Sequence, residues 1–287
     1  MPGILIAETL LTDIALCESP RWHADRLWFA DWGAREIVAV DVHGHRQRVT
    51  GVSSFPFSID WLPDGRLLVV SPGTGQLLRM EPDGSLVAHA ELAATSVKPW
   101  NEIVIDGRGN VYLNNIGFDF PDGEVTTGIV ALVTPDGLVR QVADDVAFPN
   151  GMVVTPDNST LIVAESYANQ LTAFDIKANG DLTNRRVWAH LGTGVPDGIC
   201  LDADGAVWYA DVPNQCCVRV REGGEVLETI HVDRGCFACM LGGAGSTGDG
   251  RTLFIMAARW PDVMDPTGPR TGQVLTAQAP APGVGWP

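Results

Sequence analysis

The 287-residue sequence is 45% hydrophobic and carries a net charge of −16, from 19 basic and 35 acidic residues. Such an acidic chain lacks the basic surface that a nucleic-acid backbone requires, and no segment approaches the roughly 18 consecutive apolar residues of a membrane-spanning helix. We therefore expect no nucleic-acid partner and no membrane partner. Residues 1–16 lack the basic start and cleavage site of a secretion signal, so we expect a cytoplasmic protein.

Turn dipeptides recur along the chain, each between two short apolar runs that are typical of β-strands. They are Asp25-Arg26, Asp64-Gly65, Arg108-Gly109, Asp157-Asn158, Asp204-Gly205 and, after an insertion at residues 245–248, Asp249-Gly250. An anchor residue stands seven positions before each of the first five turns, and Ala238 opens the sixth copy. The five anchors are Glu18, Phe57, Asn101, Asn150 and Asp197. The spacings of 39, 44, 49, 47 and 41 residues predict an all-β fold, a six-bladed β-propeller with one four-stranded blade per repeat.

The two ends of the chain lie outside this repeat. Residues 4–12 resemble a strand that has no partner in its own unit, and we expect it to close the ring by pairing with the last blade near residues 273–276. Residues 1–278 are then a single propeller domain. The tail at 279–287 is rich in Pro, Gly and Ala, and we expect it to be loosely ordered.

Four of the anchors carry a side-chain oxygen, and the repeat places all four at one mouth of the central channel. Glu18, Asn101, Asn150 and Asp197 are the oxygen ligands that hard cations such as Ca²⁺ and Mg²⁺ prefer. The alternative is that Asn150-Gly151 and Asp197-Gly198 are ordinary turn dipeptides. Four oxygens at the same register of a repeat favour a site. The chain should return to this mouth 13 to 15 residues after an anchor, at Asp31, Asn114, Asn115, Glu165 and Asp211.

The other residues that could bind metals or act as nucleophiles are less informative. We expect the six cysteines to be reduced and mostly buried, and the single C-x-x-C at Cys236 and Cys239 has no second pair to complete a zinc site. No histidine stands at an anchor, which argues against a histidine-based zinc centre.

Four motifs make the chain similar to the regucalcin–gluconolactonase family over about residues 8–276. They are Cys17-Glu18-Ser19-Pro20-Arg21-Trp22, Asn101 followed by Gly109-Asn110-Val111-Tyr112, Phe148-Pro149-Asn150-Gly151, and Pro196-Asp197-Gly198-Ile199-Cys200-Leu201-Asp202. The resemblance implies a six-bladed propeller and, for many members, a metal-dependent lactonase. It implies that Glu18, Asn150 and Asp197 bind one divalent cation, Ca²⁺ or Mg²⁺, with Zn²⁺ and Mn²⁺ also compatible. It further implies that Asn101 contacts water or substrate and that Asp197 is the general base.

The chain departs from this family where a sugar would bind. Sugar lactonases of the family commonly carry Arg-x-Asn-Asp where this chain has Pro99-Trp100-Asn101-Glu102, and their second sugar-binding acid falls near Asp119. Aromatic residues at or beside the same mouth favour a less polar substrate: Phe57, Trp100, Phe148 and Phe237. The substrate-binding residues that we predict are Asn101, Trp100, Asp119, Phe148 and Phe237.

These observations predict a divalent-metal-dependent lactonase, a carboxylic ester hydrolase that acts on a small molecule less polar than a sugar lactone. One alternative is metal-assisted hydrolysis of another ester, as in a phosphotriesterase. Another is a calcium-binding propeller without turnover. A strictosidine-synthase-like propeller is disfavoured because the metal-binding oxygens are all present. We expect a monomer or a weak homodimer.

Overall fold

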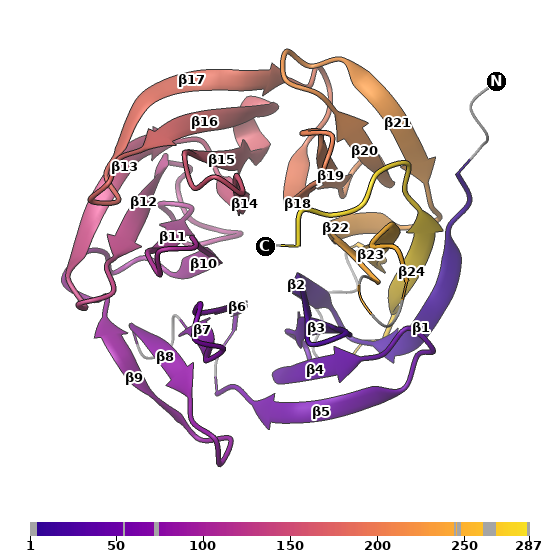
Figure 1. Cartoon of the computed structure of the whole chain (residues 1–287), viewed down its shortest axis with the longest axis horizontal. Coiled ribbons are helices and arrows are strands. Elements are labelled where there is room, and N and C mark those ends of the chain that lie inside the picture. Colours follow the sequence, from indigo (N-terminus) through magenta and orange to yellow (C-terminus); the bar gives the residue numbers. More distant parts are fainter. Residues whose placement is uncertain are drawn as a thin grey trace.

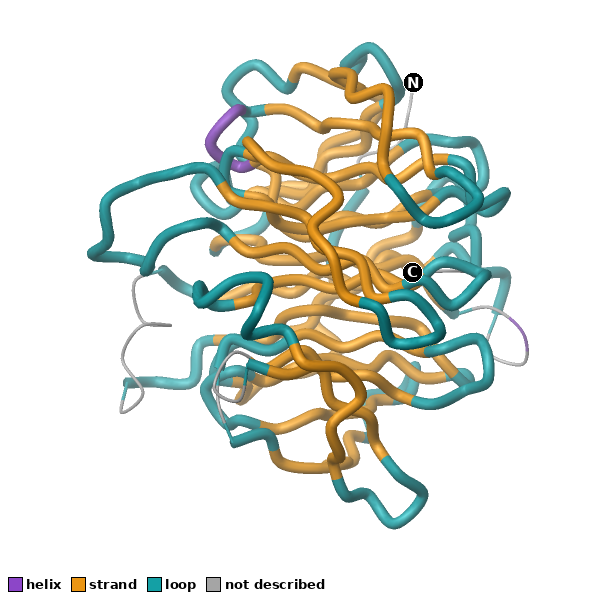
Figure 2. The backbone as a smooth tube through the Cα atoms, turned by 90° about the vertical axis from the view of Figure 1, so that its left-hand side faces the viewer, coloured by secondary structure: helices purple, strands orange, loops and turns teal. Residues whose placement is uncertain are grey.

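A computed structural model of the chain describes residues 5–53, 55–71, 75–243, 245, 248–260 and 268–285. Six four-stranded antiparallel sheets stand around a central channel as the blades of a β-propeller, and the chain visits them in order (Figure 1). Seen from the side, the strands occupy the middle of the molecule and loops project from them to the left and right (Figure 2). The predicted six-bladed, all-β fold is confirmed.

The strands of the first three blades are β2 (Cys17–His23), β3 (Arg26–Asp31), β4 (Glu36–Val40) and β5 (Arg46–Gly51); β6 (Ser58–Trp61), β7 (Leu67–Ser71), β8 (Gln76–Met80) and β9 (Leu86–Glu91); β10 (Trp100–Ile105), β11 (Val111–Asn115), β12 (Gly128–Val133) and β13 (Val139–Val146).

The strands of the last three blades are β14 (Pro149–Val154), β15 (Thr160–Glu165), β16 (Gln170–Ile176) and β17 (Leu182–His190); β18 (Pro196–Leu201), β19 (Val207–Asp211), β20 (Cys216–Val220) and β21 (Val226–His231); β22 (Gly235–Gly242), β23 (Thr252–Ala258) and β24 (Gly272–Gln278), with β1 (Glu8–Ile14). A short 3₁₀ helix, η1 (Ser166–Ala168), follows β15. No helix in the described ranges is long and apolar enough to cross a membrane.

The ring is closed by β1, which pairs antiparallel with β24, with Glu8 opposite Thr276 and Ile14 opposite Gly272. This confirms the predicted closure. The strand lies further along the chain than the predicted range of 4–12: it spans residues 8–14, and residues 5–7 are not in a strand. Blade 6 therefore joins the two ends of the chain, and its outer edge is β1.

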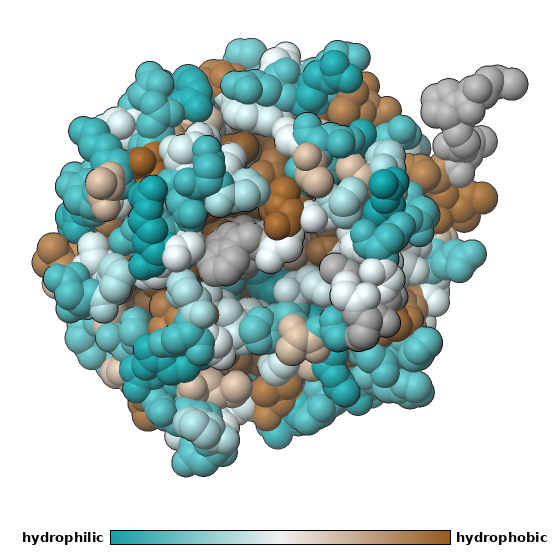
Figure 3. Space-filling model, viewed as in Figure 1, coloured by the Kyte–Doolittle hydropathy of each residue, from teal (hydrophilic) through white to brown (hydrophobic). Residues whose placement is uncertain are grey.

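The hydrophobic core lies between neighbouring blades, because successive residues of a strand face opposite sides of its sheet. On β10, Ile103 and Ile105 pack in a cluster with blade 2, whereas Val104 between them packs in a cluster with blade 4. The six cysteines are free and buried, as predicted. In contrast to this apolar core, the surface is mostly hydrophilic at the periphery of the ring in Figure 3, in keeping with the net charge of −16.

The described part of the C-terminal tail contacts the propeller, where the sequence predicts a loose segment. Gly283 forms a β-bridge with Asp202, and the amide of Ala203 donates to the carbonyl of Pro282 at 2.8 Å. Asp202 follows the end of β18, whereas the anchor Asp197 stands at its start, so the tail lies at the end of the channel opposite the anchors. In Figure 1 the C-terminus lies over the centre of the ring.

Candidate metal and substrate site

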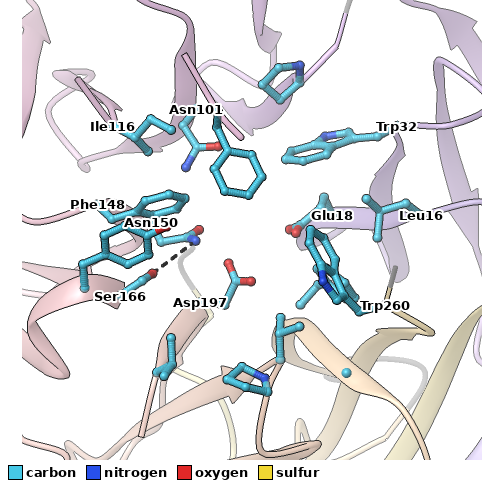
Figure 4. Close-up of a pocket in the computed structure, with 18 of the residues that line it drawn as sticks. Leu16, Glu18, Trp32, Asn101, Ile116, Phe148, Asn150, Ser166, Asp197 and Trp260 are labelled. Carbon is cyan, nitrogen blue, oxygen red and sulfur yellow. Dashed lines mark hydrogen bonds between the residues drawn. The ribbon is translucent and has the colours of Figure 1, made fainter. Parts of the chain in front are cut away.

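The four oxygen-bearing anchors converge at one mouth of the channel, as the repeat predicts. In Figure 4, Glu18, Asn101, Asn150 and Asp197 point toward one another from β2, β10, β14 and β18. All four line a single cavity of about 1090 Å³. No three His, Cys, Asp or Glu side chains in the described part of the chain gather into a metal-binding group, and this set contains only two carboxylates beside its two amides.

A β-bulge shapes the backbone at each oxygen anchor. The register shifts lie between Glu18 and Arg21 in β2, Trp100 and Ile103 in β10, Pro149 and Met152 in β14, and Pro196 and Ile199 in β18. β6 pairs with β7 without a shift, and the anchor before it is Phe57. Bulges re-aim side chains at the rims of β-structures. A similar shift lies between Cys236 and Ala238 in β22, so the bulge is shared by five of the six inner strands and is present at all four oxygen anchors.

The glycines after two anchors are required by close packing of the inner strands. A Cβ atom at Gly151 would lie 2.5 Å from the amide nitrogen of Ile199, and one at Gly198 would lie 2.7 Å from the Cα of Ala238. Both contacts are with backbone atoms, which cannot move aside cheaply. The Asn-Gly and Asp-Gly pairs therefore sit at the contacts between blades rather than in hairpin turns.

The two carboxylates are held close together with few partners. Burial raises the pKa of Glu18 well above its usual value, and the neighbouring charges of Asp197 and Glu102 add to the shift. Burial, and then the charge of Glu102, likewise raise the pKa of Asp197, and a hydrogen bond with the Asn150 side chain offsets part of this shift. Among the described residues, the hydrogen bond that Glu18 accepts comes from the amide of Ser19 at 3.2 Å. A divalent cation would relieve this repulsion, so the donor set fits a hard metal ion.

Hydrogen bonds to the neighbouring blades orient the two amides. Asn101 Nδ2 donates to the carbonyl of Pro149 at 3.2 Å, which leaves its Oδ1 for the cavity. Asn150 Nδ2 lies 3.5 Å from Ser166 Oγ, the contact drawn in Figure 4, and the Ser166 hydroxyl donates to the carbonyl of Pro196 at 2.6 Å. Blades 3, 4 and 5 are thereby tied together at the site.

Glu102 is a polar residue of the site that sequence reasoning missed. It is buried, and its Oε1 accepts from Ser19 Oγ at 3.3 Å and from Arg21 Nη2 at 3.3 Å. Arg21 also lies 3.6 Å from Asp60, whose pKa burial raises to about 7. The signal was present in the sequence: Glu102 directly follows an anchor, where the other oxygen-bearing anchors are followed by Ser or Gly.

Two of the predicted substrate contacts lie elsewhere. Trp100 does not line the cavity; its side chain is 1% exposed and packs in the core between blades 2 and 3. The reason is alternation: Trp100 pairs with Asn115 across the sheet, so it faces a neighbouring blade while Asn101 faces the channel. Asp119 is also outside the lining, and its exposed carboxylate pairs with Lys98 at 2.9 Å. Neither Lys98 nor Asp119 lines the cavity, so neither takes the place of the arginine that binds sugar in the family.

Phe148 and Phe237 line the cavity as predicted, and further aromatic residues join them from the loops. Phe57 does not; it is fully buried in the core. The aromatic residues of the lining are Trp32, Phe55, Phe118, Phe120, Phe148, Tyr167, Phe237 and Trp260. Several of them stand just after a second strand, at equivalent places in their blades. That position is the signal that could have located them.

The residues that close the second strands have a structural role. Asp31 accepts from the amides of Leu16 at 3.2 Å and Ala34 at 3.2 Å, and Glu165 accepts from the amide of Ala147 at 2.7 Å. Asp211 accepts from the amide of Val195 at 2.9 Å. These carboxylates fix the chain as it enters each inner strand, so they position the anchors rather than face the cavity.

Comparison with known proteins agrees with this architecture. Residues 16–259 match the model of the SMP-30/Gluconolactonase/LRE-like region. Human regucalcin is 29% identical over 91% of this chain and 89% of its own length, and pentonolactonase XacC of Haloferax volcanii is 25% identical over 83% and 85%. Diisopropyl-fluorophosphatase of Loligo vulgaris is 27% identical, but the match spans 62% of this chain and 63% of that relative, less than two thirds of its length.

Solved structures share the fold at lower sequence identity. A luciferin-regenerating enzyme superposes with a TM-score of 0.82 at 19% identity, over 98% of both chains. The gluconolactonase XC5397 of Xanthomonas campestris gives a TM-score of 0.76 at 22% identity, over 95% of this chain and 90% of that one. Since the family model covers most of the propeller, including all four oxygen anchors, this chain belongs to the SMP-30/gluconolactonase/LRE-like family.

Proposed function

We propose that the protein is a divalent-metal-dependent lactonase that acts on a lactone less polar than a sugar lactone. The observation that carries the proposal is the convergence of two carboxylates and two amides on the floor of a cavity whose walls are mainly aromatic. Relatives named as a pentonolactonase and a gluconolactonase support the lactonase class. Glu18, Asn150 and Asp197 would hold the cation, Ca²⁺ or Mg²⁺.

The cation, when bound, would polarise the ester carbonyl and stabilise the negative charge that develops on its oxygen. Asp197 lines the cavity and would take the proton from the attacking water. Asn101 would accept a hydrogen bond from that water through Oδ1, because its Nδ2 donates to Pro149. The aromatic walls exclude bulk water and hold the apolar part of the lactone. No serine or cysteine nucleophile is required.

The substrate preference follows from what the cavity lacks. Pro99 lines it where sugar lactonases commonly have arginine, and Lys98 and Asp119 pair with each other outside it. Sugar hydroxyls placed against the aromatic walls would therefore lose water without gaining partners there, which costs binding free energy. An apolar substituent against an aromatic wall gains about 1.5 to 3 kcal/mol, or roughly ten- to a hundredfold in specificity.

The test compares kcat/KM for gluconolactone with that for a γ-lactone bearing an alkyl or aryl group, in saturating Ca²⁺ and in Mg²⁺. We expect the apolar lactone to be preferred by about tenfold or more and a chelator to abolish both activities. A tenfold preference for gluconolactone would contradict the proposal that the aromatic walls select a lactone less polar than a sugar lactone. Tight metal binding without turnover of any lactone would instead favour a calcium-binding propeller.

A second candidate function is hydrolysis of a phosphorus ester at the same site. The match to diisopropyl-fluorophosphatase favours it, because a site that polarises a carbonyl oxygen can polarise a phosphoryl oxygen in the same way. Including a dialkyl aryl phosphate in the same panel distinguishes the two. Turnover of the phosphate above that of every lactone would assign the site to phosphorus esters.

A further inference from the structure

The cavity is chemically asymmetric between opposite blades. On the side of blades 3 and 4, four rings form a continuous surface, which we call the aromatic wall: Phe118, Phe120, Phe148 and Tyr167. Phe148 is at its centre, with ring centroids 4.5 Å from Tyr167, 5.8 Å from Phe118 and 5.7 Å from Phe120. Phe120 and Tyr167 are 44% and 51% exposed, so their faces remain available to a ligand.

Blade 6 lies opposite blade 3 in the ring, and it brings two arginines to the same cavity. Gly235 at the start of β22 pairs with Ala258 at the end of β23, so Arg234 and Arg259, one residue further out, stand side by side at the mouth. Asp233 is the acidic residue beside them. Asp233 contacts both arginines, at shorter distances for Arg234 than for Arg259.

Arg234 is fully engaged within the protein. Its Nε and Nη2 donate to the two oxygens of Asp233 at 2.7 and 2.8 Å, and its Nη1 donates to the carbonyl of Thr271 at 2.7 Å. The contact of Arg259 with Asp233 is much longer, 3.8 Å, and its side chain is 60% exposed. Among the described residues Asp233 is the acidic partner of both, so it is committed to Arg234 and leaves Arg259 able to bind another anion.

The charges around the cavity are therefore unevenly placed. The charged residues of its lining are Glu18, Asp197, Asp233, Arg234 and Arg259. The first two lie on the floor, where a cation would neutralise them. Among the described residues at the mouth, two arginines accompany one aspartate, an excess of one positive charge in a chain whose net charge is −16. A local charge of the opposite sign to the whole protein selects anions at that point.

We infer that the substrate is a lactone that carries both an aryl group and an anionic group such as a carboxylate. The inference rests on the proposed lactonase function and refines its substrate class. The lactone carbonyl lies over the floor, the aryl group packs on the aromatic wall, and the anionic group pairs with Arg259 on the opposite side. A cavity of about 1090 Å³ has room for such a ligand, which is larger than a single sugar ring.

The test uses lactams, which bind like the corresponding lactones but resist hydrolysis, so that affinity is measured apart from turnover. Three γ-lactams are compared with the intact protein in Ca²⁺: one with a methyl substituent, one with an aryl group, and one with an aryl group and a carboxylate. Calorimetry, or the fluorescence of Trp32 and Trp260 in the lining, reports the Kd. We expect each added group to tighten binding by about five- to tenfold.

Each contact is then removed with a matched control. Arg259→Gln should abolish the preference for the carboxylated lactam and leave the neutral aryl lactam unchanged. The control is Arg221→Gln, since Arg221 is equally exposed, is paired with Glu225 at 3.4 Å, and lies outside the cavity. Tyr167→Ser should reduce the preference for aryl over methyl by about threefold or more, whereas Val226→Ser, at a residue that is 57% exposed and lies outside the cavity, should not.

The carboxylated lactam binding no tighter than the neutral one, or a preference that survives Arg259→Gln, would overturn the assignment of the anion site. Added salt should weaken the carboxylated lactam alone, because the arginine is exposed and its interaction is screened. A lactone panel that is not turned over would defeat the proposed reaction. It would leave these lactam affinities as a separate measurement of what the cavity binds.

Discussion

Two sets of acidic residues lie side by side at the same mouth of the channel and do different work. Glu18 and Asp197 stand at the starts of inner strands, and Asp31 and Asp211 close the second strands one pair away, opposite Cys17 and Pro196. Asp31 and Asp211 are 4% and 1% exposed, and Glu18 is 7% exposed, so burial alone does not separate the sets.

Hydrogen bonds separate them. Asp211 accepts from the amide of Val195 at 2.9 Å and from Asn214 Nδ2 at 2.9 Å, so its charge is stabilised within the protein. Burial is the main cause that raises the pKa values of Glu18 and Asp197; the charges of Asp197 and Glu102 add to the shift at Glu18, and the charges of Glu102 and Asp211 add to it at Asp197. Buried acids whose partners are missing from the protein indicate a binding site, whereas satisfied acids indicate a structural role.

The largest effect is expected from Asp197→Asn. It removes both a metal ligand and the proposed base while keeping the size of the side chain, so lactone turnover should fall by at least about a thousandfold and metal affinity should collapse. The measurements are kcat/KM and calorimetry with Ca²⁺ and Mg²⁺. The matched control is Asp211→Asn in the same blade, which should retain metal affinity within about threefold. Equal losses in both variants would erase the distinction between the sets.

Metal affinity should depend on pH more steeply than for ordinary carboxylates. The pKa values of Glu18 and Asp197 are raised in the metal-free protein, so a cation must displace protons, and its affinity should fall as the pH is lowered from about 8 to about 5. Carboxylates at their usual pKa values would stay ionised over that range. Calorimetry in two buffers of different ionisation enthalpy would also detect the released protons. A flat affinity without proton release would contradict the prediction.

Removing a satisfied acid should destabilise the fold. Asp211→Ala leaves the amide of Val195 and the side chain of Asn214 without their acceptor, which should lower the free energy of unfolding by about 1 to 3 kcal/mol. Denaturant unfolding of the metal-free protein measures this change. An unchanged midpoint would mean that these hydrogen bonds do not hold the entry to β18 in place.

The sequence predicts the repeating parts of the molecule well, because a fixed period carries the same physics from blade to blade. Strand order, ring closure by β1 and the convergence of the four oxygen anchors all follow from it. It does not predict which way each neighbour of an anchor points. Trp100 is one residue from Asn101 and yet lies in the core, because side chains alternate and a bulge follows.

The walls of the cavity were harder to predict because they come from loops without a common length. The loop after Asp31 reaches β4 at Glu36, whereas the loop after Asn115 runs to Gly128 and carries two rings of the aromatic wall. The contacts of the C-terminal tail with the propeller are hard to predict for a different reason. Its small residues, typical of a loose segment, instead allow close packing, since a Cβ at Gly283 would lie 2.8 Å from Leu241 Cβ.

The smallest expected effect has the opposite sign to the others. With its pKa raised in the folded protein, Asp197 favours folding at low pH, and this contribution is lost as the pH rises through the raised pKa. Above that raised pKa the metal-free protein carries an unfavourable buried charge, which Asp197→Asn removes. The variant should unfold at a higher denaturant concentration than the wild type in chelator, by about 1 kcal/mol, although it is inactive. Added Ca²⁺ should reverse the order, because it stabilises only the wild type. A variant less stable than the wild type in chelator would mean that Asp197 supports the fold as Asp211 does, and the two sets of acids would then be one.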